Sequence, residues 1–144
     1  TRHWLDVQAL VESISENAQD QGCDVQFAGT CAPLQVQPMA LRSCLNNLID
    51  NALRYAGTAL VDLQDSREAL VIRVIDHGPG IATDKREAVF EPFFRLEGSR
   101  NRNSGGVGLG MTIAKQAVER LGGRLSLEET PGGGLTAVMR LPRA

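Results

Sequence analysis

The pattern of apolar and polar residues predicts three main helices. Apolar residues recur at roughly helical spacing from Trp4 to Asn17, and again from Pro38 to about Tyr55. Pro38 suits the first turn of the second helix, where its missing N–H costs nothing, and this helix should stop by Gly57. A third helix is predicted from Leu109 to Leu121, where a pair of glycines ends it.

The same pattern predicts strands between the helices. Residues Asp24 to Ala28 alternate between polar and apolar, and the connector that follows has room for a short strand at Val36. Two hairpins are predicted, and they pair Ala59–Gln64 with Ala69–Asp76, and Arg124–Glu129 with Leu135–Leu141. The strand that begins at Ala69 is dense in β-branched residues, so we expect it at the centre of a sheet.

This order of elements favours an α+β fold rather than a regular βαβ alternation. We expect a two-layer sandwich, in which about three helices cover one face of a mixed sheet. A short helix is predicted from Thr83 to Phe90, and no periodicity is present from Glu91 to Gly106. Loops of that length in compact domains are usually functional, so this one is interpreted as a lid.

Composition limits the possible classes of protein. The 144 residues suit one domain, spanning 1–144, and the formal net charge of -2 gives no indication of a nucleic-acid partner. Three cysteines without regular spacing argue against a disulfide framework and favour a reducing compartment. Because the chain starts at Thr1 and not at Met, we interpret it as a fragment of a larger protein.

The second helix carries polar residues at an unusual density. Asn47, Asn51 and Tyr55 are spaced four residues apart and therefore share one face, and Arg54 lies beside it. Each asparagine alone is explained as a cap or cross-link of a buried turn. Burying all four groups without a ligand would be costly, so the set favours a site for a metal ion, phosphates and a flat ring.

Three further segments carry candidate chemistry. The sequence Asp76-His77-Gly78-Pro79-Gly80-Ile81 ends a buried strand with a carboxylate that can accept a hydrogen bond from an adenine amine, although an ordinary turn has the same composition. The glycines from Gly106 to Gly110 open a helix, where free N–H groups favour phosphate. Arg95, Arg100 and Arg102 could reach phosphates from the lid, and for Arg102 a solvated loop position is the simpler interpretation. Thr136, after the last glycine turn, offers a hydroxyl on the base side.

Several common motifs are absent from the sequence. It contains no GxxxxGK[ST] phosphate loop, no GxGxxG dinucleotide fingerprint, and neither GxSxG nor HExxH. A nucleotide site here would therefore be of a less common type.

In their order and spacing, these segments closely resemble the catalytic ATP-binding domain of bacterial sensor histidine kinases. That domain belongs to a wider family with DNA gyrase, Hsp90 and MutL, and has the Bergerat-type fold. Asn47-x-x-x-Asn51 with Arg54 and Tyr55 resembles its N box, Asp76-x-Gly78-x-Gly80 its G1 box, Phe90-Glu91-Pro92-Phe93-Phe94-Arg95 its F box, Gly106–Gly110 its G2 box, and Gly132–Leu141 its last glycine box and strand. The resemblance covers about Trp4 to Pro142.

The resemblance implies roles for individual residues. Asn51 would bind Mg²⁺, Asn47 and Arg54 would act in catalysis, and residues 92–106 would form the ATP lid. The implied ATP-binding set is Asn47, Asn51, Arg54, Tyr55, Asp76, Gly78, Gly80, Ile81, Phe94, Arg95, Arg100, Gly106, Val107, Gly108, Leu109, Gly110 and Thr136.

One substitution separates the chain from the ATPases of the wider family, which have a glutamate where Asn47 stands. An amide cannot activate water, so we expect transfer to another acceptor and not hydrolysis. In histidine kinases that acceptor is a histidine on a separate dimerisation domain, of which residues 1–4 would be a linker remnant. His3 and His77 do not fit this role, so we predict that the chain binds ATP and does not phosphorylate itself.

The resemblance also implies partners and a location. The partners would be the dimerisation domain of the same protein and a response regulator. The parent would be a homodimer anchored in the bacterial inner membrane, with this domain in the cytoplasm and monomeric when isolated. Two alternatives remain, namely a nucleotide-responsive binding module without phosphoryl transfer, and a gyrase-like ATPase.

Overall fold

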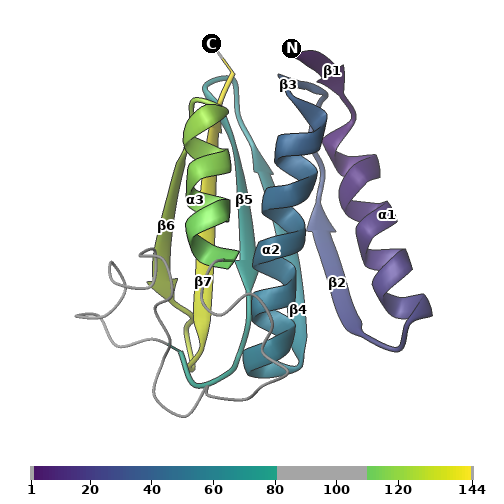
Figure 1. The fold of residues 1–144 in the computed structure, drawn as a ribbon, viewed down its shortest axis with the longest axis vertical. Coiled ribbons are helices and arrows are strands. Elements are labelled where there is room, and N and C mark those ends of the chain that lie inside the picture. The colour runs from purple at the N-terminus through teal and green to yellow at the C-terminus, as the bar shows by residue number, and fades with distance from the viewer. Residues whose placement is uncertain (1, 81–109, 144) are drawn as a thin grey trace.

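The computed structural model describes residues 2–80 and 110–143 (Figure 1). The short helix predicted at Thr83–Phe90 and the lid predicted at 92–106 lie outside the described residues. The elements, in chain order, are β1 (His3–Leu5), α1 (Val7–Asp20), β2 (Asp24–Gly29), β3 (Leu34–Val36), α2 (Pro38–Ala56), β4 (Thr58–Asp65), β5 (Ala69–Ile75), α3 (Gly110–Arg120), β6 (Arg124–Glu129) and β7 (Leu135–Pro142).

A five-stranded sheet forms one layer of the domain. Its strand order is β2-β4-β5-β7-β6, with β2 parallel to β4 and the other neighbours antiparallel, so the sheet is mixed. The strand predicted to be central, β5, lies in the middle. Helices α1, α2 and α3 cover one face of this sheet (Figure 1), which confirms the predicted α+β sandwich.

The core fills the space between the helices and the sheet. In β5, Leu70, Ile72 and Val74 are buried, whereas the residues that alternate with them are more exposed. Leu41 and Leu45 of α2 are fully buried against the same layer. Each such side chain contributes about 1.5–3 kcal/mol through burial, which explains why this pattern determines the two-layer arrangement.

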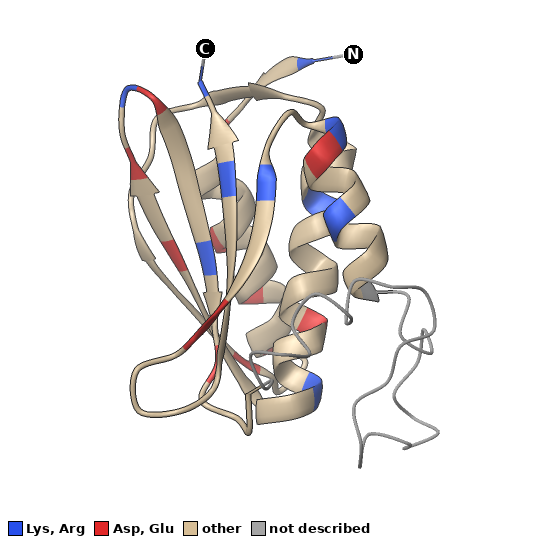
Figure 2. Ribbon diagram, turned by 90° about the vertical axis from the view of Figure 1, so that its left-hand side faces the viewer, with Lys and Arg blue, Asp and Glu red and all other residues tan. Residues whose placement is uncertain are grey.

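The other face of the sheet carries charged residues among apolar ones. Asp62 of β4 and Arg73 of β5 are partners in the antiparallel register, and both alternate with buried residues. Figure 2 shows charged positions along several strands, and alternation turns these side chains away from the helices. A sheet with one solvated face is typical of antiparallel pairing.

The start of the chain differs from the prediction. Helix α1 begins at Val7 and not at Trp4, because Asp6 is its N-cap and accepts a hydrogen bond from the Ala9 N–H at 3.0 Å. Trp4 and Leu5 belong instead to β1, which pairs antiparallel with β3. The helical spacing of these two residues was coincidental, and the ribbon they form was not predicted.

Helix α2 ends at the same end of the molecule as β5. Gly57 ends the helix in the left-handed conformation, with φ of 78°, and its N–H binds the Leu53 carbonyl at 2.9 Å, as predicted from the sequence. The end of α2, the end of β5 and the start of β7 lie at the same end of the molecule, opposite the two termini (Figure 1). No helix within residues 2–80 and 110–143 combines the length and hydropathy needed to cross a membrane.

Candidate functional site

Three segments meet where α2 ends: the last turn of α2, the turn after β5, and the turn between β6 and β7. A Cβ added to Gly78 would lie 2.9 Å from the Ala56 Cβ and 2.9 Å from the Tyr55 carbonyl oxygen. The turn after β5 therefore packs its backbone directly on the helix end, and only glycine fits at this position.

The two turns also pack backbone against backbone. Gly134 has φ of 119°, and an added Cβ would lie 2.1 Å from the Asp76 carbonyl oxygen. Gly80 has φ of 73°, and its added Cβ would lie 3.0 Å from the Gly134 carbonyl oxygen. These glycines bring the end of β5 and the start of β7 together, which holds Asp76 at the centre of the junction.

Asp76 is buried and its carboxylate is fixed by backbone groups. Its Oδ1 accepts hydrogen bonds from the N–H groups of Gly78 and Leu135, both at 3.0 Å, and its own N–H binds the Leu135 carbonyl at 2.9 Å. Both bonds that the carboxylate accepts from described residues go to Oδ1. Its Oδ2 can therefore accept a hydrogen bond from a ligand, such as an amine.

The polar residues of α2 lie along the flank of the helix above this junction. Asn47, Asn51 and Tyr55 are half-buried and Arg54 is exposed. None of the four makes a side-chain hydrogen bond or ion pair with another described residue. Since no polar atom of these side chains is buried without a partner, the groups are open to solvent and a polar ligand could bind them.

Helix α3 starts beside this polar flank. The Sγ of Cys44 lies 3.6 Å from the Ala114 carbonyl oxygen, which sets the level at which α2 and α3 pack. The two helices run in opposite directions (Figure 1), so Gly110, about 6 Å before Ala114 at about 1.5 Å per residue, lies near the Asn47 turn. The start of α3 therefore lies next to the amides of α2, and the N-terminus of a helix favours an anion.

The residues of the candidate site could bind Mg²⁺ only together with the phosphates of a ligand. Within residues 2–80 and 110–143 there is no group of three or more His, Cys, Asp and Glu that could hold a metal ion. Asn51 offers one neutral amide oxygen, and Mg²⁺ usually takes its remaining ligands from water and phosphate oxygens. The chain's own residues would therefore bind the metal as part of a nucleotide complex.

The structure does not place Thr136 where the sequence suggested. In β7, Thr136 is the register partner of Ile75 and Glu128, whereas Ala137 and Met139 face the core. Alternation therefore puts Thr136 on the face turned away from the helices. Its hydroxyl is 2.9 Å from that of Thr130, and both residues are buried.

The residue on the helix-facing side is Leu135, which sequence reasoning missed. It lies on the same side of the sheet as Ala137 and bonds to Asp76 through its backbone. The glycine turn predicted a hairpin but left its register open by one residue, and a shift of one residue exchanges the two faces. Only the paired register shows which of the two neighbours faces the site.

Eight residues of the predicted nucleotide-binding set lie outside the residues that the structure describes. They are Ile81, Phe94, Arg95, Arg100, Gly106, Val107, Gly108 and Leu109. The structure brings together the others on α2, on the turn after β5 and at the start of α3, with Thr136 as the exception.

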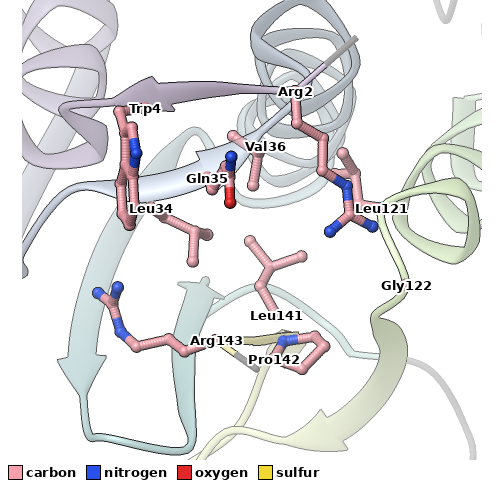
Figure 3. A pocket seen from close by; sticks show the side chains of 10 residues that line it. All are labelled: Arg2, Trp4, Leu34, Gln35, Val36, Leu121, Gly122, Leu141, Pro142 and Arg143. Carbon is pink, nitrogen blue, oxygen red and sulfur yellow. The ribbon is translucent and has the colours of Figure 1, made fainter.

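A concavity lies at the opposite end of the molecule, between the β1–β3 ribbon and the end of β7. Its volume is about 290 Å³, with Leu34 and Leu141 pointing toward one another across it and Arg2 and Arg143 at its sides (Figure 3). None of its lining residues belongs to the predicted nucleotide set. This cavity is therefore separate from the candidate site.

An α+β sandwich with a carboxylate at the end of a central strand and an amide-rich helix on the same side of the sheet suits a nucleotide-binding domain. Comparison with known proteins gives the family. The sequence model of the histidine kinase-, DNA gyrase B- and HSP90-like ATPases matches residues 36–144, and the chain belongs to this family.

Individual relatives are sensor kinases. The chain is 39% identical to the sensor histidine kinase GtrS of Pseudomonas aeruginosa over 140 residues, which is 96% of this chain and 28% of the relative. It is 41% identical to the sensor histidine kinase CpxA of Escherichia coli K12 over 111 residues, 76% of this chain and 24% of the relative. The chain thus spans about a quarter of the length of these relatives.

A solved structure agrees with this assignment. The ATP-binding domain of PrrB from Mycobacterium tuberculosis superposes with a TM-score of 0.81 at 26% identity, covering 99% of this chain and 98% of that domain. The chain is therefore a member of this ATPase family that has sensor histidine kinases among its relatives and the fold of the PrrB ATP-binding domain.

Proposed function

We propose that this domain donates the γ-phosphoryl group of ATP to a histidine on a separate dimerisation domain of the same parent protein. The observation that carries this proposal is the row of half-buried polar groups on α2, without partners among the described residues, beside a carboxylate fixed by backbone bonds. The family and the kinase relatives support the same reading.

Each residue of α2 has a role that suits its chemistry. Asn51 contributes an amide oxygen to Mg²⁺, and Asn47 binds a metal-bound water or a phosphate. Arg54 is exposed and can reach phosphate, while Tyr55 shapes the base pocket. Asp76 accepts a hydrogen bond from the adenine amine. Bound Mg²⁺ supplies positive charge that offsets the charge on the phosphates.

The proposal also assigns roles to residues 81–109, which the structure does not describe. Residues 92–106 form the lid, with Arg95 and Arg100 directed to phosphate. Gly106, Val107, Gly108, Leu109 and Gly110 bring backbone N–H groups to the phosphate chain. Ile81 and Phe94 contribute apolar surface near the base.

Water is not the acceptor in this proposal. Asn47 carries an amide and cannot take a proton from water, which distinguishes the chain from hydrolases of the wider family. The chain's own histidines do not suit the role of acceptor either. His3 lies in β1 at the opposite end of the molecule, and His77 is exposed in the turn beside Asp76.

The proposal also covers the parent protein to which this domain belongs. We infer that it is a homodimeric sensor kinase, anchored in the bacterial inner membrane, with this domain on the cytoplasmic side and a response regulator as its phosphoryl acceptor. The short coverage of the relatives supports a parent with further domains.

The test combines the purified domain with a dimerisation domain from the parent and labelled ATP. Asn51→Ala should reduce Mg²⁺-dependent labelling of the dimerisation domain at least about 100-fold, since an in-line transfer needs the metal in place. Asn46→Ala is the matched control, because Asn46 is exposed on the same helix and should label normally.

Three results would contradict the proposal. The first is an acid-labile label on the isolated domain. The second is rapid hydrolysis of ATP without a dimerisation domain, which would indicate a gyrase-like ATPase. The third is tight ATP binding with no transfer to any dimerisation domain, which would indicate a nucleotide-responsive binding module.

A further inference from the structure

The cavity at the end of the molecule that carries the termini is lined by three separate parts of the chain. They are the β1–β3 ribbon, the turn that follows α3 and the end of β7, and the volume between them is about 290 Å³. Leu34 and Leu141, both buried, lie between its two sides (Figure 3). An apolar cavity of about 150 Å³ can hold a benzene ring, so this volume suits a ligand of about two fused rings.

The one tryptophan of the chain borders this cavity and is largely uncovered. Trp4 lies in β1 and is 71% exposed, so most of its indole ring is open to a ligand. A single exposed aromatic residue is common on protein surfaces and by itself indicates nothing. Here the ring stands beside a cavity, where a flat apolar ligand would gain both burial and a ring–ring contact.

Two arginines border the cavity, and only one of them has its charge matched within the described residues. Arg143 binds the carboxylate of Asp65 and two backbone carbonyls. Arg2 is exposed and makes no hydrogen bond or ion pair with another described residue. An anionic group in the cavity would therefore bind Arg2 and not Arg143.

The simplest structural role for Arg2 would be to cap α3. Its Nη2 lies 3.9 Å from the position of a Cβ added to Gly122, so the guanidinium lies over the turn that ends this helix. Basic side chains often donate to the last carbonyls of a helix. Arg2 donates to none of them within the described part of the chain, so its N–H groups are available to a ligand.

We propose that this cavity binds a small aromatic carboxylate. The rings of the ligand lie against the indole of Trp4, and its carboxylate binds the guanidinium of Arg2 on the other side of the cavity (Figure 3). A guanidinium and a carboxylate match through two parallel hydrogen bonds, and aromatic rings favour one another at short range, so the two residues select a flat anion. This site is independent of the proposed function, because none of its lining residues belongs to the nucleotide set.

The experiment titrates the ¹⁵N-labelled domain with 2-naphthoate. The indole N–H resonance of Trp4 reports on the site without ambiguity, because the chain has one tryptophan, and a saturable shift is expected. Calorimetry gives the affinities of two matched ligands. The neutral 2-naphthalenemethanol should bind about three- to tenfold more weakly, because it lacks the charge, and benzoate about tenfold more weakly, because it buries less apolar surface.

Variants separate the charge from the cavity. Arg2→Gln should lower the affinity for 2-naphthoate to that of the neutral alcohol and leave the affinity for the alcohol unchanged. Arg124→Gln is the matched control, because Arg124 is an exposed arginine that does not line this cavity, and it should bind normally. Leu34→Phe fills the cavity and should abolish binding of both ligands, whereas Leu34→Met keeps a similar volume and should retain it. Melting curves establish that each variant is folded.

Three results would overturn the proposal. The first is the absence of a saturable shift of the Trp4 resonance. The second is an equal affinity for 2-naphthoate in the wild type and in Arg2→Gln. The third is unchanged binding by a folded Leu34→Phe variant. If Leu34→Phe does not fold, the comparison with Arg2→Gln still decides, because Arg2 is exposed and its substitution leaves the core intact.

Discussion

The two ends of the domain use polar groups in opposite ways. At the end that carries the termini, the Arg143 guanidinium makes four hydrogen bonds within the protein. It donates to both carboxylate oxygens of Asp65, each at 2.8 Å, and to the carbonyls of Ala32 and Pro33 at 3.0 and 2.8 Å. At the nucleotide end, Asn47 and the polar residues that follow it on α2 make no such bonds to described residues.

This difference separates stability from function. A charged group with partners in the protein holds segments together, as Arg143 joins the end of β7 to the end of β4 and to the segment before β3. The polar groups of α2 have no partner among the described residues and remain open to solvent, so they are available to a ligand. Changes at the far end should therefore affect unfolding, and changes at the nucleotide end should affect ATP binding.

The largest expected effect comes from the glycine that joins the two turns of the site. Gly134→Ala places a Cβ 2.1 Å from the Asp76 carbonyl oxygen at a φ of 119°, so we expect a loss of about 3 kcal/mol or more in unfolding free energy. ATP binding should also be lost, because Asp76 must move. Urea unfolding and calorimetry measure both effects.

The control for this variant is two residues away. Gly132 has φ of 88° and no atom within 4 Å of an added Cβ. Gly132→Ala should therefore show only the cost of the left-handed conformation, about 1–2 kcal/mol, with ATP binding retained. Equal effects of the two substitutions would show that the contact with Asp76 does not matter.

A matched pair of carboxylate substitutions tests the comparison directly. Asp76→Asn retains an oxygen that can accept from the backbone N–H groups but weakens recognition of the adenine amine. We expect ATP affinity to fall about 10- to 100-fold, with selectivity over inosine triphosphate reduced. Asp65→Asn should leave ATP affinity unchanged and lower the unfolding free energy by about 0.5–1 kcal/mol, because solvent screens this exposed pair. The idea fails if both variants lose ATP binding to the same degree.

The pH dependence of unfolding tests the Asp65–Arg143 pair at the end of the domain that carries the termini. The Arg143 hydrogen bonds hold the pKa of Asp65 below its ordinary value. The stabilisation is therefore present above the unfolded pKa, near about pH 4, and is lost as the pH falls through the lower folded value.

Arg143→Gln removes that stabilisation. We expect it to lower the unfolding free energy by about 1–2 kcal/mol at pH 7, with the difference from the wild type shrinking below about pH 4. Urea titrations at pH 7 and pH 3 measure this difference. A difference that grows in acid would mean that Asp65 is not the partner that matters.

The smallest effect is expected between the two ends, in the packed middle. Burial raises the pKa of the Cys44 thiol to about 12, so at pH 8 roughly one molecule in ten thousand carries the thiolate. In the folded protein, iodoacetamide should label the half-buried Cys23 far faster than Cys44. Mass spectrometry of digested protein reads out each site, and unfolding in urea should make the rates similar. Rapid labelling of Cys44 in the folded state would show that α2 and α3 separate readily.

The sequence predicted most of the fold because its signals are local. The Pro38 start and Gly57 end of α2 and both hairpins follow from residues close to one another in the chain. The ribbon of β1 with β3 was not predictable in this way. Its two strands are three residues each and are separated by α1 and β2, so neither has a recognisable pattern of its own.

For the site, the sequence by itself determined which chemical groups are available. The asparagines of α2, the carboxylate of Asp76 and the glycines around it were all recognisable from residue type and spacing. The tertiary structure alone decided which side chain of β7 accompanies Asp76. Strand register is set by pairing with β5 and β6, and a step of one residue exchanges an inward leucine for an outward threonine.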